Sequence, residues 1–139
     1  PGSVFIIPRS VNNKYIMVNQ FRYLNQLESI EFPGGGAKAD LSMERNALTE
    51  LEEEAGYTTK NLVFIGKFNP FNGVTSEICN VFLASDLALV NSNPDKSEEF
   101  EIIELTAGEI DSKIGDGTIW DGMTLAAWSI YRCSKFYKD

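Results

Sequence analysis

The sequence predicts an α/β fold in which a mixed β-sheet packs between helices. Two patterns predict it: short apolar runs typical of strands, and segments whose apolar residues recur at three- and four-residue spacing, as in helices. The chain has 139 residues and is 43% hydrophobic, enough to fill one core. Because no repeat or linker divides it, we expect one domain over residues 1–139.

Short apolar runs bounded by turn residues predict the strands. These runs occupy residues 4–8, 14–21, 63–68, 77–84 and 100–105. Asn12 and Asn13 lie between the first two runs and favour a turn, so a hairpin is expected there. Pro33 precedes three glycines, which predicts a loop with unusual backbone angles or a close approach to another group. Residues 91–97 are polar and are predicted to be flexible.

Three segments carry helical signals. Ser42 is a good N-cap, and Gly56 is a good C-terminal stop. The apolar stripe between them consists of Ala47, Leu48, Leu51 and Ala55. Residues 107–114 predict a short helix, and residues 121–136 predict a final amphipathic helix. A long helix this early in the chain, between strands, favours a mixed sheet covered by helices.

Composition excludes several classes of function. The net charge is −8, from 20 acidic and 12 basic residues, which argues against a protein that binds nucleic acid by neutralising its phosphates. The chain has no histidine, which excludes a Ser-His-Asp or Cys-His nucleophile system and a histidine-ligated zinc. No apolar stretch is long enough to span a membrane, so no membrane partner is expected.

Two residue types are expected in the core. Cys79 and Cys133 lie far apart without a metal-binding or redox pattern, so we expect buried thiols in a reducing, cytoplasmic location. Trp120 and Trp128 are also expected to be packed inside.

Three carboxylates, Glu50, Glu53 and Glu54, are spaced so that they share one face of the predicted helix. Their mutual repulsion favours a divalent cation as counter-charge, and hard oxygen ligands suit magnesium or manganese. The glycine loop before the helix offers backbone groups that can help to hold the metal or a phosphate. A solvated acidic helix face is the alternative.

The spacing around these glutamates resembles the Nudix box. That motif reads Gly, five residues, Glu, seven residues, Arg-Glu-bulky apolar, one residue, Glu-Glu, one residue, Gly-bulky apolar. Residues 35–57 align with it without a gap. Seven of nine defining positions fit, namely Gly35, Glu50, Leu51, Glu53, Glu54, Gly56 and Tyr57.

Two positions depart from the Nudix box. Leu41 stands where the family has glutamate, and Thr49 stands where it has arginine. In the family this pair supports the geometry of the loop and helix, so we expect the fold and the metal ligands to be kept and the rate to be lower. The resemblance thus implies the Nudix fold, an α/β/α sandwich, in a metal-dependent hydrolase.

Further segments resemble ADP-ribose pyrophosphatases and related nucleotide-sugar hydrolases. In chain order they are residues 18–22, 31–35, 69–77, 81–84, 97–101 and 116–121. The resemblance implies a small-molecule nucleotide substrate, such as ADP-ribose, cleaved at its diphosphate with Mg²⁺ or Mn²⁺. Those enzymes usually add an N-terminal strand region that swaps across a homodimer. This sequence starts almost at its first predicted strand, which leaves a homodimer open as an expectation.

The family resemblance also assigns site residues. The metal ligands are Glu50, Glu53, Glu54 and the carbonyl of Gly34. Glu53 is also catalytic, because it lies near the water that attacks phosphorus. Glu98 or Glu99 serves as general base or as a further ligand, with a solvated acidic turn as the alternative.

Three residues are candidates for substrate binding. Arg22 can grip a phosphate with its planar fork, or pair with an acid such as Glu28. Phe71 can stack on a base or ribose, or serve as packing. Glu77 can position the substrate or a neighbouring arginine, or be a carboxylate on a strand surface.

Two other functions compete with a diphosphate hydrolase. Leu41 and Thr49 favour a non-catalytic module that binds a nucleotide, but the intact glutamates disfavour it. A nucleoside triphosphate or capped-RNA pyrophosphohydrolase is the other alternative. The acidic composition and the ADP-ribose-like segments disfavour it.

Overall fold

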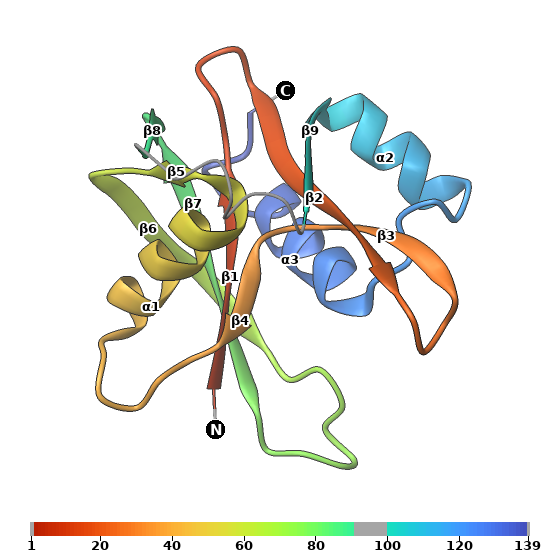
Figure 1. Ribbon diagram of the computed structural model, residues 1–139, viewed down its shortest axis with the longest axis horizontal. Coiled ribbons are helices and arrows are strands. Elements are labelled where there is room, and N and C mark those ends of the chain that lie inside the picture. Colours follow the sequence, from red (N-terminus) through yellow and green to blue (C-terminus); the bar gives the residue numbers. More distant parts are fainter. Residues whose placement is uncertain (1, 91–99, 139) are drawn as a thin grey trace.

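The computed structural model describes residues 2–90 and 100–138, and Figure 1 shows the path of the chain. In this part, the strands are β1 (Gly2–Pro8), β2 (Lys14–Arg22), β3 (Leu27–Glu31), β4 (Gly34–Gly36), β5 (Tyr57–Thr58), β6 (Asn61–Phe68), β7 (Ile78–Ser85), β8 (Ala88–Leu89) and β9 (Glu101–Thr106). The helices are α1 (Met43–Glu50), the π-helical turn η1 (Leu51–Ala55), α2 (Ala107–Gly115) and α3 (Gly122–Arg132). Among the described helices, none has the length and apolar character needed to cross a membrane.

The strands form one mixed sheet and two smaller antiparallel sheets. The mixed sheet has the order β4-β1-β7-β6, in which β1 runs parallel to β7 and the other neighbours are antiparallel. In the second sheet β2 lies between β3 and β9, and in the third β5 pairs with β8. The predicted mixed sheet is confirmed, although the strands divide among several sheets.

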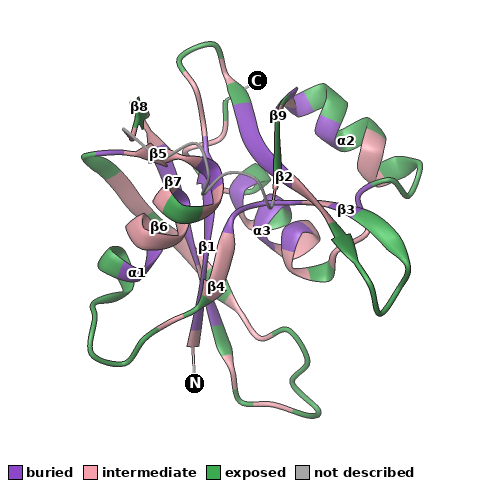
Figure 2. Ribbon diagram, viewed as in Figure 1, coloured by how far each residue is buried: buried purple, intermediate pink, exposed green. Residues whose placement is uncertain are grey.

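Successive residues of the central strands face two separate apolar clusters, because side chains alternate along a strand. In β7, Val81 and Leu83 pack in the cluster that contains Trp128 of α3. Phe82, between them, packs in the cluster that contains Leu51 of η1. The mixed sheet therefore lies between α3 on one face and α1 with η1 on the other (Figures 1 and 2). This arrangement confirms the predicted α/β/α sandwich.

Local signals place the first helix correctly. The Ser42 hydroxyl accepts a hydrogen bond from the Arg45 N–H at 3.0 Å, as an N-cap does. Gly56 ends the helical segment with φ at 75°, a left-handed angle that favours glycine.

The glycine segment is a strand rather than the predicted loop. β4 pairs antiparallel with β1, with Gly34 opposite Phe5 and Gly36 opposite Ser3. A Cβ atom at Gly34 would lie 2.3 Å from the Phe5 ring and 2.5 Å from the Val4 carbonyl oxygen. Only glycine permits this spacing, so the predicted close approach is confirmed.

The predicted hairpin between the first two strands forms only at its tip. β1 and β2 meet at one isolated bridge, between Arg9 and Tyr15, and each then joins a different sheet. The turn itself forms, with Asn13 at a φ of 55°. The apolar runs predicted the strands, but partner choice depends on distant parts of the chain.

Three smaller predictions also need correction. α3 ends at Arg132, before the predicted residue 136, where the Ser134 N–H and hydroxyl donate to the Tyr131 carbonyl at 3.0 and 2.7 Å. Cys133 is exposed, whereas Cys79 is buried as expected. Trp120 is only half-buried and its indole N–H donates to the Glu28 carbonyl at 2.9 Å, whereas Trp128 lies in the core.

Candidate active site

The candidate glutamates lie where α1 continues into η1. A π-helical turn is rare, and it occurs frequently at functional sites. Glu50 and Glu54 are half-buried, and their carboxyl groups share a hydrogen bond. Glu53, between them in sequence, is exposed. Two of the three predicted ligands therefore come together, and the third lies at the surface.

Both carboxyl groups lie against the glycine strand β4. The Gly34 N–H donates to Glu54 Oε1 at 3.1 Å. A Cβ atom at Gly35 would lie 2.9 Å from Glu50 Oε1, so the missing side chain leaves the room that this carboxylate occupies. The contact from Gly34 thus uses its N–H, and the metal-binding role of its carbonyl stays a prediction.

Burial makes the charged form of this pair unfavourable. It is the main cause that raises the pKa of Glu54 to about 8, with further repulsion from Glu50 and Glu31 and an opposing effect of the Gly34 N–H. Burial likewise raises the pKa of Glu50, while Lys38 acts in the opposite direction. The ion pairs among the described residues involve neither Glu50 nor Glu54. A cation placed here would therefore be strongly favoured.

The residues present suit a hard divalent metal in part. Glu50 and Glu54 offer carboxylate oxygens, the ligands that magnesium and manganese prefer. Within residues 2–90 and 100–138, no three acidic or thiol side chains are close enough together to hold a metal as they stand. Two carboxylates, with water and substrate phosphates completing the shell, match how Mg²⁺ is usually bound.

Arg22, which lines the same cleft as Glu54, binds Glu31 rather than the predicted alternative partner Glu28. Arg22 Nε lies 2.9 Å from Glu31 Oε2, and Nη2 lies 2.7 Å from Oε1. Gln20 also donates to Glu31, at 3.3 Å. The Glu31 side chain is 6% exposed, but that of Arg22 is 46% exposed and still reaches solvent.

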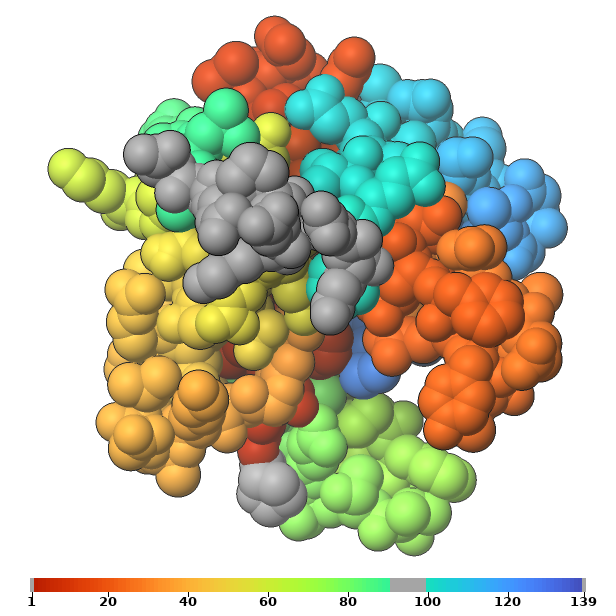
Figure 3. Space-filling view, in the orientation of Figure 1, coloured from red at the N-terminus to blue at the C-terminus, as the bar shows by residue number. Residues whose placement is uncertain are grey.

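A cleft of about 370 Å³ lies between these two groups of residues. Glu54 and the glycines of β4 line one side, and Arg22 with Glu31 lines another. Apolar side chains of Phe5, Phe32, Phe100 and Met123 complete the lining. Figure 3 shows this hollow between β4, the β2–β3 hairpin and the loop after β6, with β1 at its floor.

Glu77 and Phe71 lie outside the lining of this cleft. The Glu77 carboxylate accepts hydrogen bonds from the Ser3 hydroxyl and the Cys79 thiol. Burial raises the pKa of that thiol to about 11, so it stays protonated. Because Ser3 lines the cleft, Glu77 is connected to the cleft through its hydrogen bond with Ser3. Phe71 is 64% exposed, which disfavours the packing role, and its contact with a substrate stays a prediction.

Sequence reasoning missed Asn46, a buried residue at the start of α1. Its amide nitrogen donates to the carbonyls of Lys38, Leu41 and Ser42, and its oxygen accepts from the Lys38 N–H at 2.8 Å. The side chain therefore clamps the loop between β4 and α1. An asparagine on the buried side of a predicted helix is the signal that would have identified it.

Asp121 is the second residue that the sequence analysis missed. Its carboxylate caps α3 through the Thr124 N–H at 3.0 Å and hydroxyl at 2.8 Å. Burial raises its pKa, and Glu31 adds to this effect. Glu98 and Glu99, the predicted bases, lie outside the described residues.

Comparison with known proteins identifies the family. The family model described as the NUDIX domain matches residues 1–120. The chain belongs to the Nudix family. This Nudix hydrolase is 34% identical to an ADP-ribose pyrophosphatase of Bacillus subtilis (strain 168) and 31% identical to a methanol dehydrogenase activator of Bacillus methanolicus. Each alignment covers 91% of this chain and 70% of the relative.

Solved structures confirm the fold of this Nudix hydrolase. A crystal structure described as an ADP compounds hydrolase matches with a TM-score of 0.83 at 21% identity, covering 94% of this chain and 70% of that one. A Nudix hydrolase from Nitrosomonas europaea matches with a TM-score of 0.72 at 17% identity, covering 94% and 87%. The predicted Nudix fold and the predicted class of enzyme are both confirmed.

Proposed function

We propose that this Nudix hydrolase cleaves the diphosphate of a nucleoside diphosphate linked to another group, with ADP-ribose as the first candidate. The observation that carries the proposal is the half-buried pair of Glu50 and Glu54, which has no cation among the described ion pairs and lies at the edge of a cleft. A divalent metal would neutralise the two carboxylates and give the same surface a positive potential, which attracts a polyanion.

The cleft offers two groups that suit the diphosphate of such a substrate, and apolar surface that suits its organic part. On one side, Glu50 and Glu54 would hold Mg²⁺ or Mn²⁺, which when bound neutralises phosphate charge and acidifies a water. On the other side, Arg22 keeps a half-exposed guanidinium whose fork matches phosphate oxygens. Phe100 and Met123, which are half-buried in the lining, supply apolar surface for the organic part.

Glu53 and the acidic loop complete the proposed chemistry. Glu53 is exposed one residue before Glu54, and we assign to it, on the family resemblance, a role near the attacking water. We assign the general base to Glu98 or Glu99 and contacts with the substrate to Phe71 and Glu77, on the family resemblance. A cytoplasmic location and a homodimer are further parts of the proposal.

The named relatives support the substrate class. One is an ADP-ribose pyrophosphatase, and another, 26% identical over 101 residues, is a CMP-5'-(N-acetyl-N-hydroxy-3-aminopropyl)phosphonate hydrolase of Streptomyces rubellomurinus (strain ATCC 31215). Both names describe a nucleotide joined to a second group. The latter alignment covers 49% of that protein, so it supports the class of substrate and not the base or sugar.

The test is a substrate panel with Mg²⁺ or Mn²⁺, containing ADP-ribose, nucleoside diphosphate sugars, dinucleotides and nucleoside triphosphates. Chromatography of the products should show a nucleoside monophosphate and a sugar phosphate. Reaction in oxygen-18 water identifies the attacked phosphorus. If triphosphates are hydrolysed far faster than every nucleotide sugar, the substrate class is wrong. Saturable binding of a nucleotide without hydrolysis of any substrate would instead support the non-catalytic module.

A further inference from the structure

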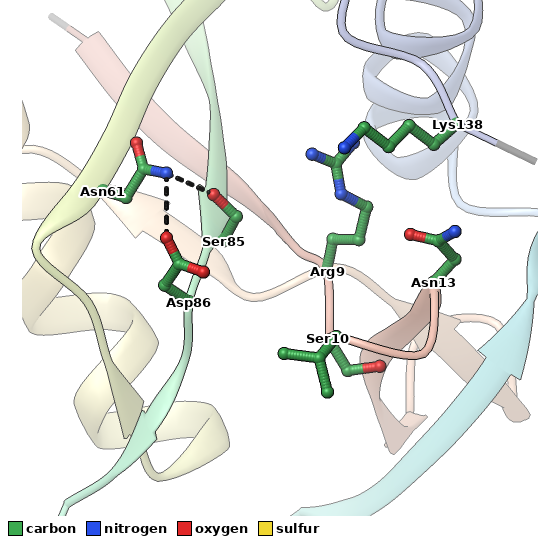
Figure 4. A pocket seen from close by; sticks show the side chains of 8 residues that line it. Arg9, Ser10, Asn13, Asn61, Ser85, Asp86 and Lys138 are labelled. Atoms are coloured by element: carbon green, nitrogen blue, oxygen red, sulfur yellow. Dashed lines mark hydrogen bonds between the residues drawn. The ribbon is translucent and has the colours of Figure 1, made fainter.

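A second cavity, of about 310 Å³, lies beyond the end of β1 that is remote from the glycine strand. Arg9, which follows β1, and Lys138 form one wall (Figure 4). Asn61 and Ser85, at the start of β6 and the end of β7, form the other with Asp86. The C-terminal segment reaches this end of the molecule, whereas the N-terminus lies at the opposite end of β1 (Figure 1).

The two basic residues are held in place by one pair of buried tyrosines. Tyr15 and Tyr131 are fully buried, and their hydroxyls are 2.6 Å apart. Arg9 Nη1 donates to the Tyr131 hydroxyl at 2.8 Å and to the Phe136 carbonyl at 2.7 Å. Lys138 is tied to the same pair, because its N–H donates to Tyr131 at 3.2 Å and its carbonyl accepts from Tyr15 at 2.9 Å. The wall is therefore preorganised.

The positive charge of this wall is not neutralised by the described acids. The ion pairs among the described residues join other side chains, and neither Arg9 nor Lys138 takes part. Asp86 is the one acidic residue of the described lining, and its carboxylate accepts a hydrogen bond from Asn61 at 3.3 Å, drawn in Figure 4. The cavity thus concentrates positive charge in a chain whose net charge is −8.

We propose that this cavity is a second anion site, which binds a phosphate group through Arg9 and Lys138. Arg9 has donors beyond the one nitrogen that Tyr131 and Phe136 hold, and a planar guanidinium suits phosphate oxygens. The amide of Asn61 and the hydroxyl of Ser10 add polar groups to the same cavity. The phosphate can be free inorganic phosphate or can belong to a nucleoside monophosphate. Its binding would join the loop after β1 to the C-terminal segment.

Calorimetric titration with inorganic phosphate tests the proposal, at constant ionic strength and with a chelator present so that the glutamates cannot recruit phosphate through metal. Lys138→Gln removes one charge and keeps the backbone contacts with Tyr15 and Tyr131. It should weaken phosphate binding about tenfold, the effect of losing one charge-assisted contact. Lys135→Gln is the matched control, because Lys135 is exposed in the same segment and lies outside the described lining.

A second variant and a second ligand sharpen the result. Arg9→Lys keeps the charge but loses the fork, and should also weaken phosphate binding. Because it gives up the contacts of Nη1 with Tyr131 and Phe136, its thermal unfolding midpoint without phosphate should fall as well, whereas that of Lys138→Gln should not. AMP in place of phosphate distinguishes the two sources, since tighter binding of AMP that Lys138→Gln weakens would identify a nucleotide. Absence of saturable phosphate binding, or equal losses in Lys138→Gln and Lys135→Gln, would overturn the proposal.

Discussion

Glu31 and Glu54 are two carboxylates of the same cleft in opposite electrostatic situations. Glu31 is almost completely buried and accepts two hydrogen bonds from Arg22 and one from Gln20. Glu54 has the Gly34 N–H and the neighbouring Glu50, and its pKa is raised to about 8. A buried acid with its counter-ion holds structure together, whereas a buried acid without one favours whatever cation arrives. We therefore expect Glu31 to position Arg22, and Glu54 to be the residue that recruits a metal.

The largest effect should follow from replacing the unpaired acid. Glu54→Gln should lower metal-dependent hydrolysis by about 100-fold or more, because a ligand matters at least as much as the groups that support it. It should leave the metal-free protein as stable as before, since a neutral amide replaces a carboxyl group that is unfavourable when charged. Activity assays and chemical denaturation measure the two effects.

Glu52→Gln is the matched control for this prediction. Glu52 lies in the same turn and pairs at the surface with Arg45 at 3.4 Å, so its replacement should change little. Manganese titration should show binding to the control and much weaker binding to Glu54→Gln. Full activity of Glu54→Gln would contradict the assignment of the metal site.

At the paired acid Glu31, in contrast, removing the partner should lower the stability of the protein. Arg22→Ala leaves Glu31 buried without its cation, which should cost about 1–3 kcal/mol in the free energy of unfolding. If Arg22 also contacts a phosphate, hydrolysis should fall by about ten- to a hundredfold.

A double variant separates these two roles of Arg22. Arg22→Ala with Glu31→Gln removes the stranded charge, so stability should largely return while activity stays low. Recovery of both would show that Arg22 only neutralises Glu31, and its assignment as a substrate-binding residue would then be wrong.

Removing the clamp at Asn46 should lower metal-dependent activity less than replacing Glu54 or Arg22 does. Asn46→Ala leaves the backbone groups of the loop before α1 without their partner, which should cost about 1–3 kcal/mol of stability. That loop joins β4, with Gly34 and Gly35, to α1, with Glu50, so its loosening should lower metal affinity as well. Denaturation and manganese titration of the same sample measure both. A stability loss with unchanged metal affinity would confine Asn46 to folding.

The smallest effect concerns the two departures from the family motif. Leu41→Glu with Thr49→Arg should raise turnover by roughly fivefold, equivalent to about 1 kcal/mol, if the restored pair stiffens the loop and helix. Leu41 is 37% exposed and Thr49 half-buried, so neither change opens the core. Steady-state kinetics of the double variant and the unchanged protein measures the difference in turnover. An unchanged or lower rate would show that the clamp at Asn46 already supplies this support.

Local chemistry predicted what lies close together in the chain. Ser42 and Gly56 bound the helical segment because a cap and a left-handed glycine act within one turn. The spacing of Glu50 and Glu54 predicted that they share a face, and the structure places them in contact. The widened turn of η1, which leaves Glu53 exposed, has no equally local signal in the sequence.

Partners distant in the chain were harder to predict. Arg22 pairs with Leu27 across the β2–β3 ladder, yet its guanidinium reaches Glu31 further along β3. Glu28 is nearer in sequence and was the natural alternative, but side-chain length and burial decided the contact. The hairpin between β1 and β2 stops at its tip for the same reason, because β1 pairs with β4 and β7.

The close packing at Gly34 limits how this enzyme can vary. The residue contributes no functional side chain, yet any added atom would collide with Phe5 and Val4 and push β4 outward. That movement would carry away the N–H that holds Glu54 and widen the cleft at the same time. In a library of random variants, position 34 should therefore tolerate fewer substitutions than the exposed Glu53, although Glu53 is a proposed catalytic residue and Gly34 offers no side chain.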